Sequence, residues 1–168
     1  GEKPNNANTT RAGRAYYHEI LESKKFTPTA IASALKRTDF IVFGDSRTNL
    51  DVNKKVVDKI CSYKPKAVFH TGDMVEVGAK MDQWNAVMPV NQCLIGPKIL
   101  YHSCGNHEDK NCVDNPVRKA LENTKHYYLK EFMGLSFIAL DSHTVPGDEL
   151  QWLGKLPNGK SYIPFFHP

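Results

Sequence analysis

Apolar and polar positions along the chain alternate between two kinds of segment. Short apolar runs, typical of buried strands, are followed by longer stretches with apolar residues at helical spacing. The strand-like runs are 39–47, 66–73, 98–108 and 160–168, and the helical patterns cover 27–37, 50–65, 80–94, 115–123 and 148–157. Strands that alternate with helices predict an α/β fold with a largely parallel core sheet.

Local signals refine this picture. In the helix predicted over 50–65, one face is expected to carry Val52, Val56, Ile60 and Tyr63. Pro89 is expected to bend or end the helix of 80–94, because proline cannot donate the backbone hydrogen bond. Residues 125–143 predict a β-hairpin whose turn lies at Met133 and Gly134.

Polar residues gather where the apolar runs end. The runs close with "FGDSR", "HTGDMVE" and "SCGNHE", and a later one with "FFHP". In open α/β sheets the loops past the carboxyl ends of the strands form the ligand crevice. We therefore expect Asp45, Asp73, Asn106, His107 and His167 to converge. Glycine before each of the first three loops permits tight turns and close backbone approach.

Composition limits the possible domain organisation and function classes but does not identify the function. The 168 residues are 40% hydrophobic and 24% charged, with a formal net charge of +4. Such a chain fits one folded domain, here 38–168, after a polar tail at 1–13 that we expect to be disordered and a helical segment at 14–37. The interspersed charges give no strong nucleic-acid signal, and no apolar run is long enough to span a membrane.

The four cysteines show no CxxC pair, so a zinc knuckle is not expected. Cys61 and Cys93 have the setting of small core residues. Cys104 and Cys112 flank the "GNHEDKN" loop, where they either stay free or form a disulfide if the protein is exported. Pairing would favour a periplasmic or extracellular location over the cytoplasm; no signal peptide is visible, and a leading Gly resembles a protease scar.

The ordered blocks "GDSR" (44–47), "GD" (72–73), "GNHE" (105–108) and "HP" (167–168) resemble the calcineurin-like metallophosphoesterase family, which includes the purple acid phosphatases. The resemblance spans 38–168 and includes "YYLKEFMGLSFIALDS" and "ELQWLGKLP". It implies a β-sandwich core flanked by helices. It also implies hydrolysis of phosphate monoesters or diesters, small or macromolecular, by a hydroxide that bridges two divalent metal ions (Mn, Fe or Zn).

The resemblance also assigns the metal ligands. Asp73 would bridge the two ions and Asp45 would complete the shell of the first. Asn106 and His167 would bind the second, through a neutral carbonyl oxygen and an imidazole nitrogen. A neutral ligand limits the negative charge beside an anionic substrate. The alternative for each aspartate alone is an ordinary turn or helix-cap residue.

The expected catalytic residues are His107, Glu108 and Arg47. His107 would protonate the leaving alkoxide or bind a phosphate oxygen, and Glu108 would orient its ring. Arg47 stands where the common D-x-H block has a histidine ligand; arginine cannot coordinate a metal, but its planar fork suits phosphate oxygens. We therefore expect Arg47 to clamp substrate and the first metal site to be weakened.

Two more features separate this chain from the family pattern. Glu76 occupies the position where the purple branch has tyrosine, so a tyrosinate–iron site is not expected, although Glu76 could assist a metal. No counterpart of the closing GHxH block occurs before Pro168, so we expect a fold that is incomplete at its C-terminus and an activity that belongs to a longer parent. The alternative is a non-catalytic scaffold that binds phosphate or a protein partner.

Three further histidines have the setting of ordinary strand histidines: His70, His102 and His143.

Overall fold

The computed structural model describes residues 39–108, 111–143 and 147–167. The tail predicted for 1–13, the helical segment at 14–37 and the helix expected at 27–37 lie outside these residues. The described residues form a mixed α/β structure with two small sheets and helices, as the sequence predicts.

The first sheet is parallel throughout. It contains β1 (Phe40–Phe43), β2 (Ala67–His70) and β3 (Leu100–His102) in the order β1-β2-β3. Phe43 is in register with His70, and His70 with His102. The three strands therefore end at the same level, and the loops that follow them leave the sheet at one edge.

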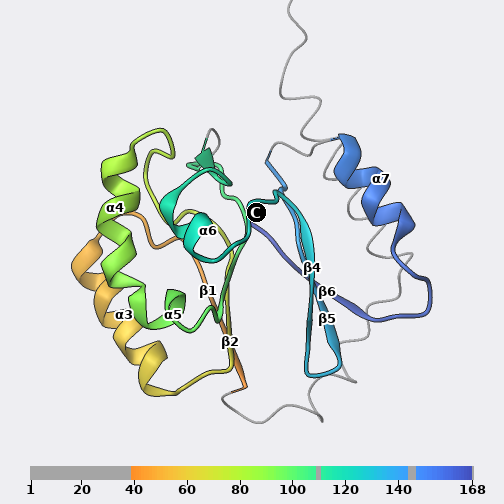
Figure 1. Cartoon of the computed structure of the whole chain (residues 1–168), viewed down its shortest axis with the longest axis horizontal. Helices are drawn as coiled ribbons and strands as arrows, with labels where there is room; N and C mark the ends of the chain where they lie inside the picture. Colours follow the sequence, from red (N-terminus) through yellow and green to blue (C-terminus); the bar gives the residue numbers. More distant parts are fainter. Residues whose placement is uncertain (1–38, 109–110, 144–146, 168) are drawn as a thin grey trace, which may run out of the picture.

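Helices connect these strands and cover one face of the sheet (Figure 1). They are α3 (Leu50–Ser62), α4 (Met81–Val90), α5 (Gln92–Ile95) and α6 (Pro116–Ala120). Asn49 caps α3 by accepting a hydrogen bond from the Val52 backbone N–H. As predicted, α4 ends at Val90, directly after Pro89. The helices bury an apolar cluster against the sheet that includes Val57, Trp84 and Leu100.

The second sheet begins with the predicted hairpin. Strands β4 (Tyr128–Phe132) and β5 (Leu135–Ala139) pair antiparallel, and β6 (Tyr162–Phe165) adds to β5 in parallel. The turn residues Met133 and Gly134 both have positive φ, 51° and 78°. Such two-residue turns match the twist of the flanking strands. Helix α7 (Gly147–Lys155) lies between β5 and β6 in the chain and packs on this sheet.

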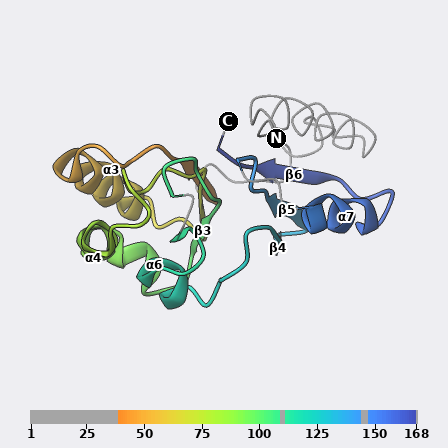
Figure 2. The same ribbon diagram turned by 90° about the horizontal axis from the view of Figure 1, so that it is seen from above.

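The two sheets face each other between two helical layers, as Figures 1 and 2 show from two directions. Phe69 of β2, Phe137 of β5 and Phe165 of β6 form an apolar layer between them. The Phe69 and Phe137 rings stack with centroids 4.1 Å apart. This layer fixes β6, and the residues that follow it, relative to the ends of the first sheet.

Two expectations about α3 were wrong. Its buried residues are Asn53, Val57 and Ile60, whereas Val52 and Val56 are exposed. Both sets have helical spacing, and packing against the sheet selects one of them. Tyr63, the helix C-cap, is also exposed.

The interpretation of Cys61 and Cys93 as separate core residues was also wrong. Cys61 in α3 and Cys93 in α5 form a disulfide across 32 positions of the sequence, with their Cα atoms 6.4 Å apart. Cys104 and Cys112 form a second disulfide across eight positions. Among the described helices, none combines the length and apolar character needed to cross a membrane.

Candidate functional site

Backbone hydrogen bonds join the loops that follow β1 and β2. The Asp45 N–H donates to the Gly72 carbonyl and the Ser46 N–H to the Asp73 carbonyl, both at 2.9 Å. Asp45 and Asp73 adopt left-handed backbone conformations, with φ of 53° and 60°. Non-glycine residues are uncommon there, although aspartate is one of those that tolerate it. Two such residues side by side mark the end of the sheet as a functional candidate.

The loop after β3 lies directly against Asp73. A Cβ atom added to Gly105 would be 2.2 Å from the Asp73 Oδ1 atom, so no side chain fits there. The His107 backbone N–H donates to the same oxygen at 3.1 Å. A Cβ atom on Gly72, whose φ is +98°, would likewise lie 2.8 Å from the Gly105 nitrogen. The predicted convergence of the three loops is therefore present in the structure, and Gly72 and Gly105 permit it.

Arg47 is the centre of the polar cluster at this edge. Its Nη1 contacts carboxylate oxygens of both Asp45 and Asp73, and its Nε donates to Glu76 Oε2 at 3.0 Å. Three carboxylates thus share one guanidinium. The Asp73 side chain is 1% exposed, whereas Asp45 and Glu76 are 64% and 47% exposed. The cluster opens toward solvent on the side of Asp45 and Glu76.

His167 reaches the cluster from the second sheet. It lies two residues beyond the end of β6, and its Nε2 is 3.3 Å from Asp73 Oδ2. Asp73 therefore lies among groups from four separate segments: Arg47 after β1, its own loop after β2, His107 after β3, and His167 after β6. Its carboxylate oxygens and the imidazole nitrogen are ligand types that a divalent transition metal accepts.

The His107 ring packs on the loop after β2. Its Nδ1 is 2.7 Å from the Glu76 carbonyl oxygen and 3.4 Å from the Glu76 carboxylate. A carbonyl only accepts, so Nδ1 carries the hydrogen and the neutral ring keeps Nε2 free to take a proton. Asn106 lies between Gly105 and His107 and is exposed. Its backbone is held beside Asp73 through these two neighbours.

Glu108 does not orient His107, contrary to the sequence prediction. Its carboxylate is fully buried and accepts backbone hydrogen bonds from Asp73 (3.2 Å), Met74 (2.7 Å) and Gly105 (2.7 Å). The fourth donor is His102 Nε2, at 3.0 Å. Burial alone would raise the pKa of Glu108, but the charge and hydrogen bonds of His102 outweigh it and, with nearby His70 and the Met74 N–H, lower this pKa to about 2.

The buried histidines have the expected structural roles. His70 receives a hydrogen bond on Nδ1 from the Gly72 N–H at 3.2 Å, and its Nε2 lies 3.0 Å from Ser46 Oγ. Burial, followed by the charge of His102, lowers the pKa of His70 to about 3. His70 is therefore neutral near pH 7, and it connects the loops after β1 and β2.

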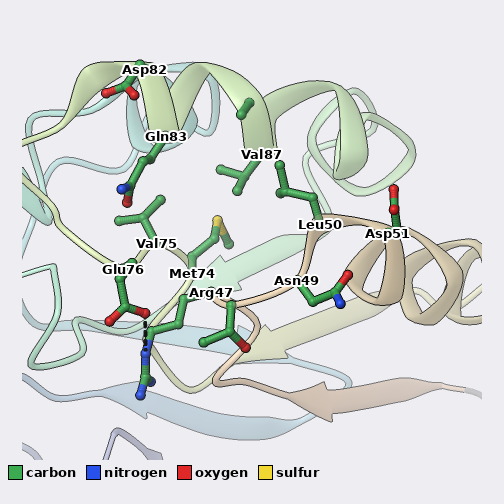
Figure 3. A pocket seen from close by; sticks show the side chains of 12 residues that line it. Arg47, Asn49, Leu50, Asp51, Met74, Val75, Glu76, Asp82, Gln83 and Val87 are labelled. Atoms are coloured by element: carbon green, nitrogen blue, oxygen red, sulfur yellow. Dashed lines mark hydrogen bonds and ion pairs between the residues drawn. The ribbon is translucent and has the colours of Figure 1, made fainter.

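A pocket of about 460 Å³ adjoins the cluster. Arg47, Asn49, Met74, Glu76 and Gln83 are among the residues that line it. Figure 3 shows Arg47 and Glu76 joined at one edge of the pocket, with apolar side chains beneath α4 on the opposite side. The pocket could hold the organic part of a ligand whose charged group lies at the cluster.

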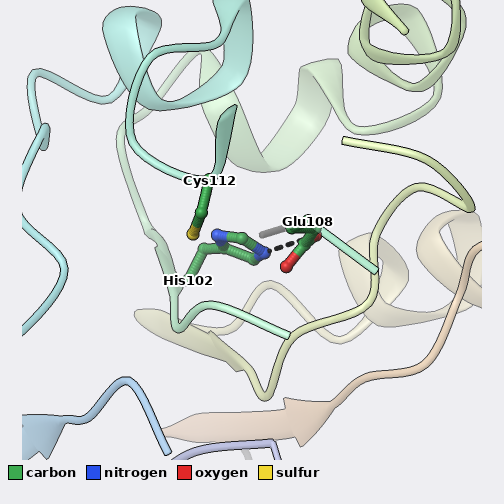
Figure 4. Close-up of side chains that lie close together, drawn as sticks. All are labelled: His102, Glu108 and Cys112. Atoms are coloured by element: carbon green, nitrogen blue, oxygen red, sulfur yellow. Dashed lines mark hydrogen bonds and ion pairs between the residues drawn. The ribbon is translucent and has the colours of Figure 1, made fainter. Parts of the chain in front are cut away.

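Two groups of side chains in the described residues are close enough to hold a metal ion, and neither contains the predicted ligands. One is His102, Glu108 and Cys112, shown in Figure 4; the other is Cys104, His126 and Asp141. Within each group the ligand atoms lie within 4.8 Å of one another. However, Cys104 and Cys112 are bonded to each other, so neither offers a thiolate while the disulfide is intact.

The structure thus brings Asp45, Arg47, Asp73, His107 and His167 together and moves Glu108 behind them. Glu76 is the residue that the sequence prediction undervalued, because it supplies a carboxylate to Arg47 and a carbonyl to His107. Its position three residues after Asp73, in the same loop, was the available signal.

Comparison of the chain with protein-family models gives no match, and no curated protein sequence matches it.

Proposed function

We propose that this chain carries the phosphate-ester hydrolysis site of a calcineurin-like metallophosphoesterase and that its two packed sheets are the corresponding sandwich. One observation carries the proposal. Asp45, Asp73, His107 and His167, which occur in the order of that family's blocks, meet at one end of the sheets. Four loops from two sheets have no packing reason to place acids and imidazoles together.

The donor set fits a divalent cation. Asp73 would be the central ligand, and Asn106 and His167 would add an amide oxygen and an imidazole nitrogen. Asp45, the ligand that the family resemblance assigns to a first ion, pairs with Arg47. A bound divalent ion would lower the pKa of its water toward neutrality and neutralise charge on a phosphoryl group. Manganese, iron and zinc all accept such mixed oxygen and nitrogen ligands.

The chain's own residues supply positioning and proton transfer. The Glu76 carbonyl fixes the hydrogen of the His107 ring on Nδ1, so a proton given to a leaving alkoxide would come from Nε2. The pocket beside Arg47 would receive the organic group of a phosphate monoester or diester. Glu108 acts through the backbone by holding the loops after β2 and β3 together.

A specific observation favours the second candidate, a non-catalytic scaffold that binds phosphate or a protein partner. Arg47 already pairs with two of the carboxylates that a metal would need. Under this alternative the chain would bind an anion at the same edge without cleaving it.

Two disulfides support an exported protein, because such bonds persist in oxidising compartments.

Hydrolysis assays separate the two candidates. We expect the chain, or a longer parent that contains it, to cleave p-nitrophenyl phosphate or its bis-ester when manganese is added. Asp73→Ala and Asn106→Ala should each reduce kcat/KM by about 100-fold or more, the usual scale for loss of such a group. Asp58→Ala, on the exposed side of α3 and outside the pocket, is the matched control and should retain activity. Unchanged activity in both site variants, with folding intact by circular dichroism, would refute the proposal.

A further inference from the structure

We propose that Arg47 is a permanent substitute for one of two metal ions, so that the site binds a single divalent cation. This inference deepens the proposed function and rests on its metal site. The guanidinium occupies the position that a first cation would need, between the carboxylates of Asp45 and Asp73. An arginine cannot be deprotonated in a protein, so this positive charge is always present.

The charge balance supports a single ion. Asp45, Asp73 and Glu76 bring three negative charges to Arg47, which returns one positive charge. The remaining two negative charges match one divalent cation. A second divalent cation would leave the cluster with an excess of two positive charges in a partly buried place, where uncompensated charge is costly.

The geometry also indicates which side stays available. Arg47 uses Nη1 for Asp45 and Asp73 and Nε for Glu76, so the guanidinium is held by all three carboxylates. His167 Nε2 lies 3.3 Å from Asp73 Oδ2, the oxygen that Arg47 Nη1 also contacts, and a second lone pair of this oxygen would bind one ion together with Nε2. The single ion would therefore be held by Asp73 and His167, with Asn106 as the further ligand that the family resemblance implies.

Burial explains why Arg47 should stay paired with the Asp73 carboxylate. The Asp73 carboxylate is 1% exposed and the Arg47 side chain 21% exposed. Removing one partner of a buried charge pair leaves the other charge uncompensated, which is strongly unfavourable. Arg47 is therefore a fixed part of the site. Only those guanidinium N–H groups that do not contact the carboxylates would be available to bind a substrate phosphate.

Manganese binding tests the inference directly. The purified chain is titrated with Mn²⁺, the bound ions are counted per chain, and electron paramagnetic resonance distinguishes an isolated ion from a coupled pair about 4 Å apart. We expect one isolated ion in the wild type. Arg47→Gln, which removes the charge, should admit a second, coupled ion. Arg47→Lys keeps the charge and should still bind one.

Several outcomes would overturn the inference: two coupled ions in the wild type, no ion in the wild type, or a single ion in folded Arg47→Gln. If Arg47→Gln does not fold, the counts for the wild type and Arg47→Lys still decide, since a coupled pair in either contradicts the inference. The readout is independent of catalysis. One bound ion with no hydrolysis of either ester would leave the inference standing and remove the proposed function.

Discussion

The loops after β1, β2 and β3, joined in the outer region by His167 after β6, build two polar regions of opposite character. The inner network consists of His70, His102, Glu108 and the backbone N–H groups that donate hydrogen bonds to them. The outer cluster consists of Asp45, Arg47, Asp73, Glu76 and His167. In the inner network one carboxylate receives four donors and is fully buried. In the outer cluster three carboxylates share one guanidinium and open to solvent.

This difference distinguishes a structural network from a cluster with unbalanced charge. A buried charge whose hydrogen bonds are all satisfied fixes the backbone around it. The outer cluster, in contrast, has more carboxylates than cations, and only a further cation or proton can balance its negative charge. The inner network therefore holds the loops in place, whereas the outer cluster is the region that we propose binds a ligand. Selective damage to each region tests this division.

The largest effect is expected at Glu108. Glu108→Ala leaves three backbone N–H groups and the His102 ring without their acceptor in a buried place. Breaking such a buried charged network costs about 3–5 kcal/mol of unfolding free energy. Urea denaturation of the two proteins measures the difference.

Glu76 provides the control for Glu108. Glu76→Gln changes a carboxylate in the same pair of loops, but this side chain is 47% exposed. Its pairing with Arg47 is therefore screened, and we expect a stability loss of under about 1 kcal/mol. Equal losses in the two variants would show that the inner network and the outer cluster do not differ as described.

The sequence predicted the convergence of the loops but not the division between them. Apolar runs that end in Gly-Asp or Gly-Asn-His place polar residues at the carboxyl ends of parallel strands, which is general for such sheets. Glu108 follows His107 directly, so a partnership between them was the simplest interpretation. In the folded loop the two side chains point to different partners, and only the backbone conformation determines this.

Long side chains and distant pairs account for the remaining errors. The pairing of Arg47 with three acids was missed because sequence does not show which acids its flexible side chain reaches, and Glu76 lies 29 positions away; its contact with phosphate stays a prediction. Similarly, nothing local links Cys61 to Cys93. In α3, valines occur on two adjacent stripes of the helix, so periodicity alone could not select Val57 over Val56 as the buried residue.

The disulfides offer a second test, because only one of them touches the two polar regions. Cys104–Cys112 closes the loop that carries Glu108 inward and His107 outward, whereas Cys61–Cys93 lies in the helical layer. Chain-entropy estimates give about 4 kcal/mol for the longer loop and about 2.5 kcal/mol for the shorter. Replacing Cys61 and Cys93 by serine should therefore lower the free energy of unfolding more.

Ligand binding should respond in the opposite order. Serine at Cys104 and Cys112 loosens the segment that holds Asn106 and His107, so manganese affinity should fall more in this variant than in the other. Calorimetric titration and urea denaturation of both double variants give the two rankings. If one pair of replacements has the larger effect on both quantities, the loop disulfide has no special role at the site.

A smaller effect than the loss at Glu108 is expected from a pH dependence that arises within the inner network. His70 has a pKa of about 3 in the folded protein, against an ordinary value near 6.5, because it is buried near His102. The unfolded chain therefore binds a proton on this residue between these values and the folded chain does not. The stability contributed by neutral His70 is complete above about pH 6.5 and is lost as the pH falls toward 3, at up to about 1.4 kcal/mol per pH unit.

Measurements between pH 7 and 5 isolate this effect, since Glu108, with its pKa of about 2, and most carboxyl groups remain ionised there. His70→Asn keeps an acceptor near the position of Nδ1, which receives the Gly72 N–H, but does not titrate. The wild type should lose about 2 kcal/mol more than His70→Asn over this range by urea denaturation. His126, whose pKa is raised by its hydrogen bond to Asp141, is not among the groups that shift the pKa of His70, so its contribution cancels in the difference. Parallel pH profiles would mean that His70 becomes protonated without opening the link between the first two loops, and the inner network would then be less rigid than its burial implies.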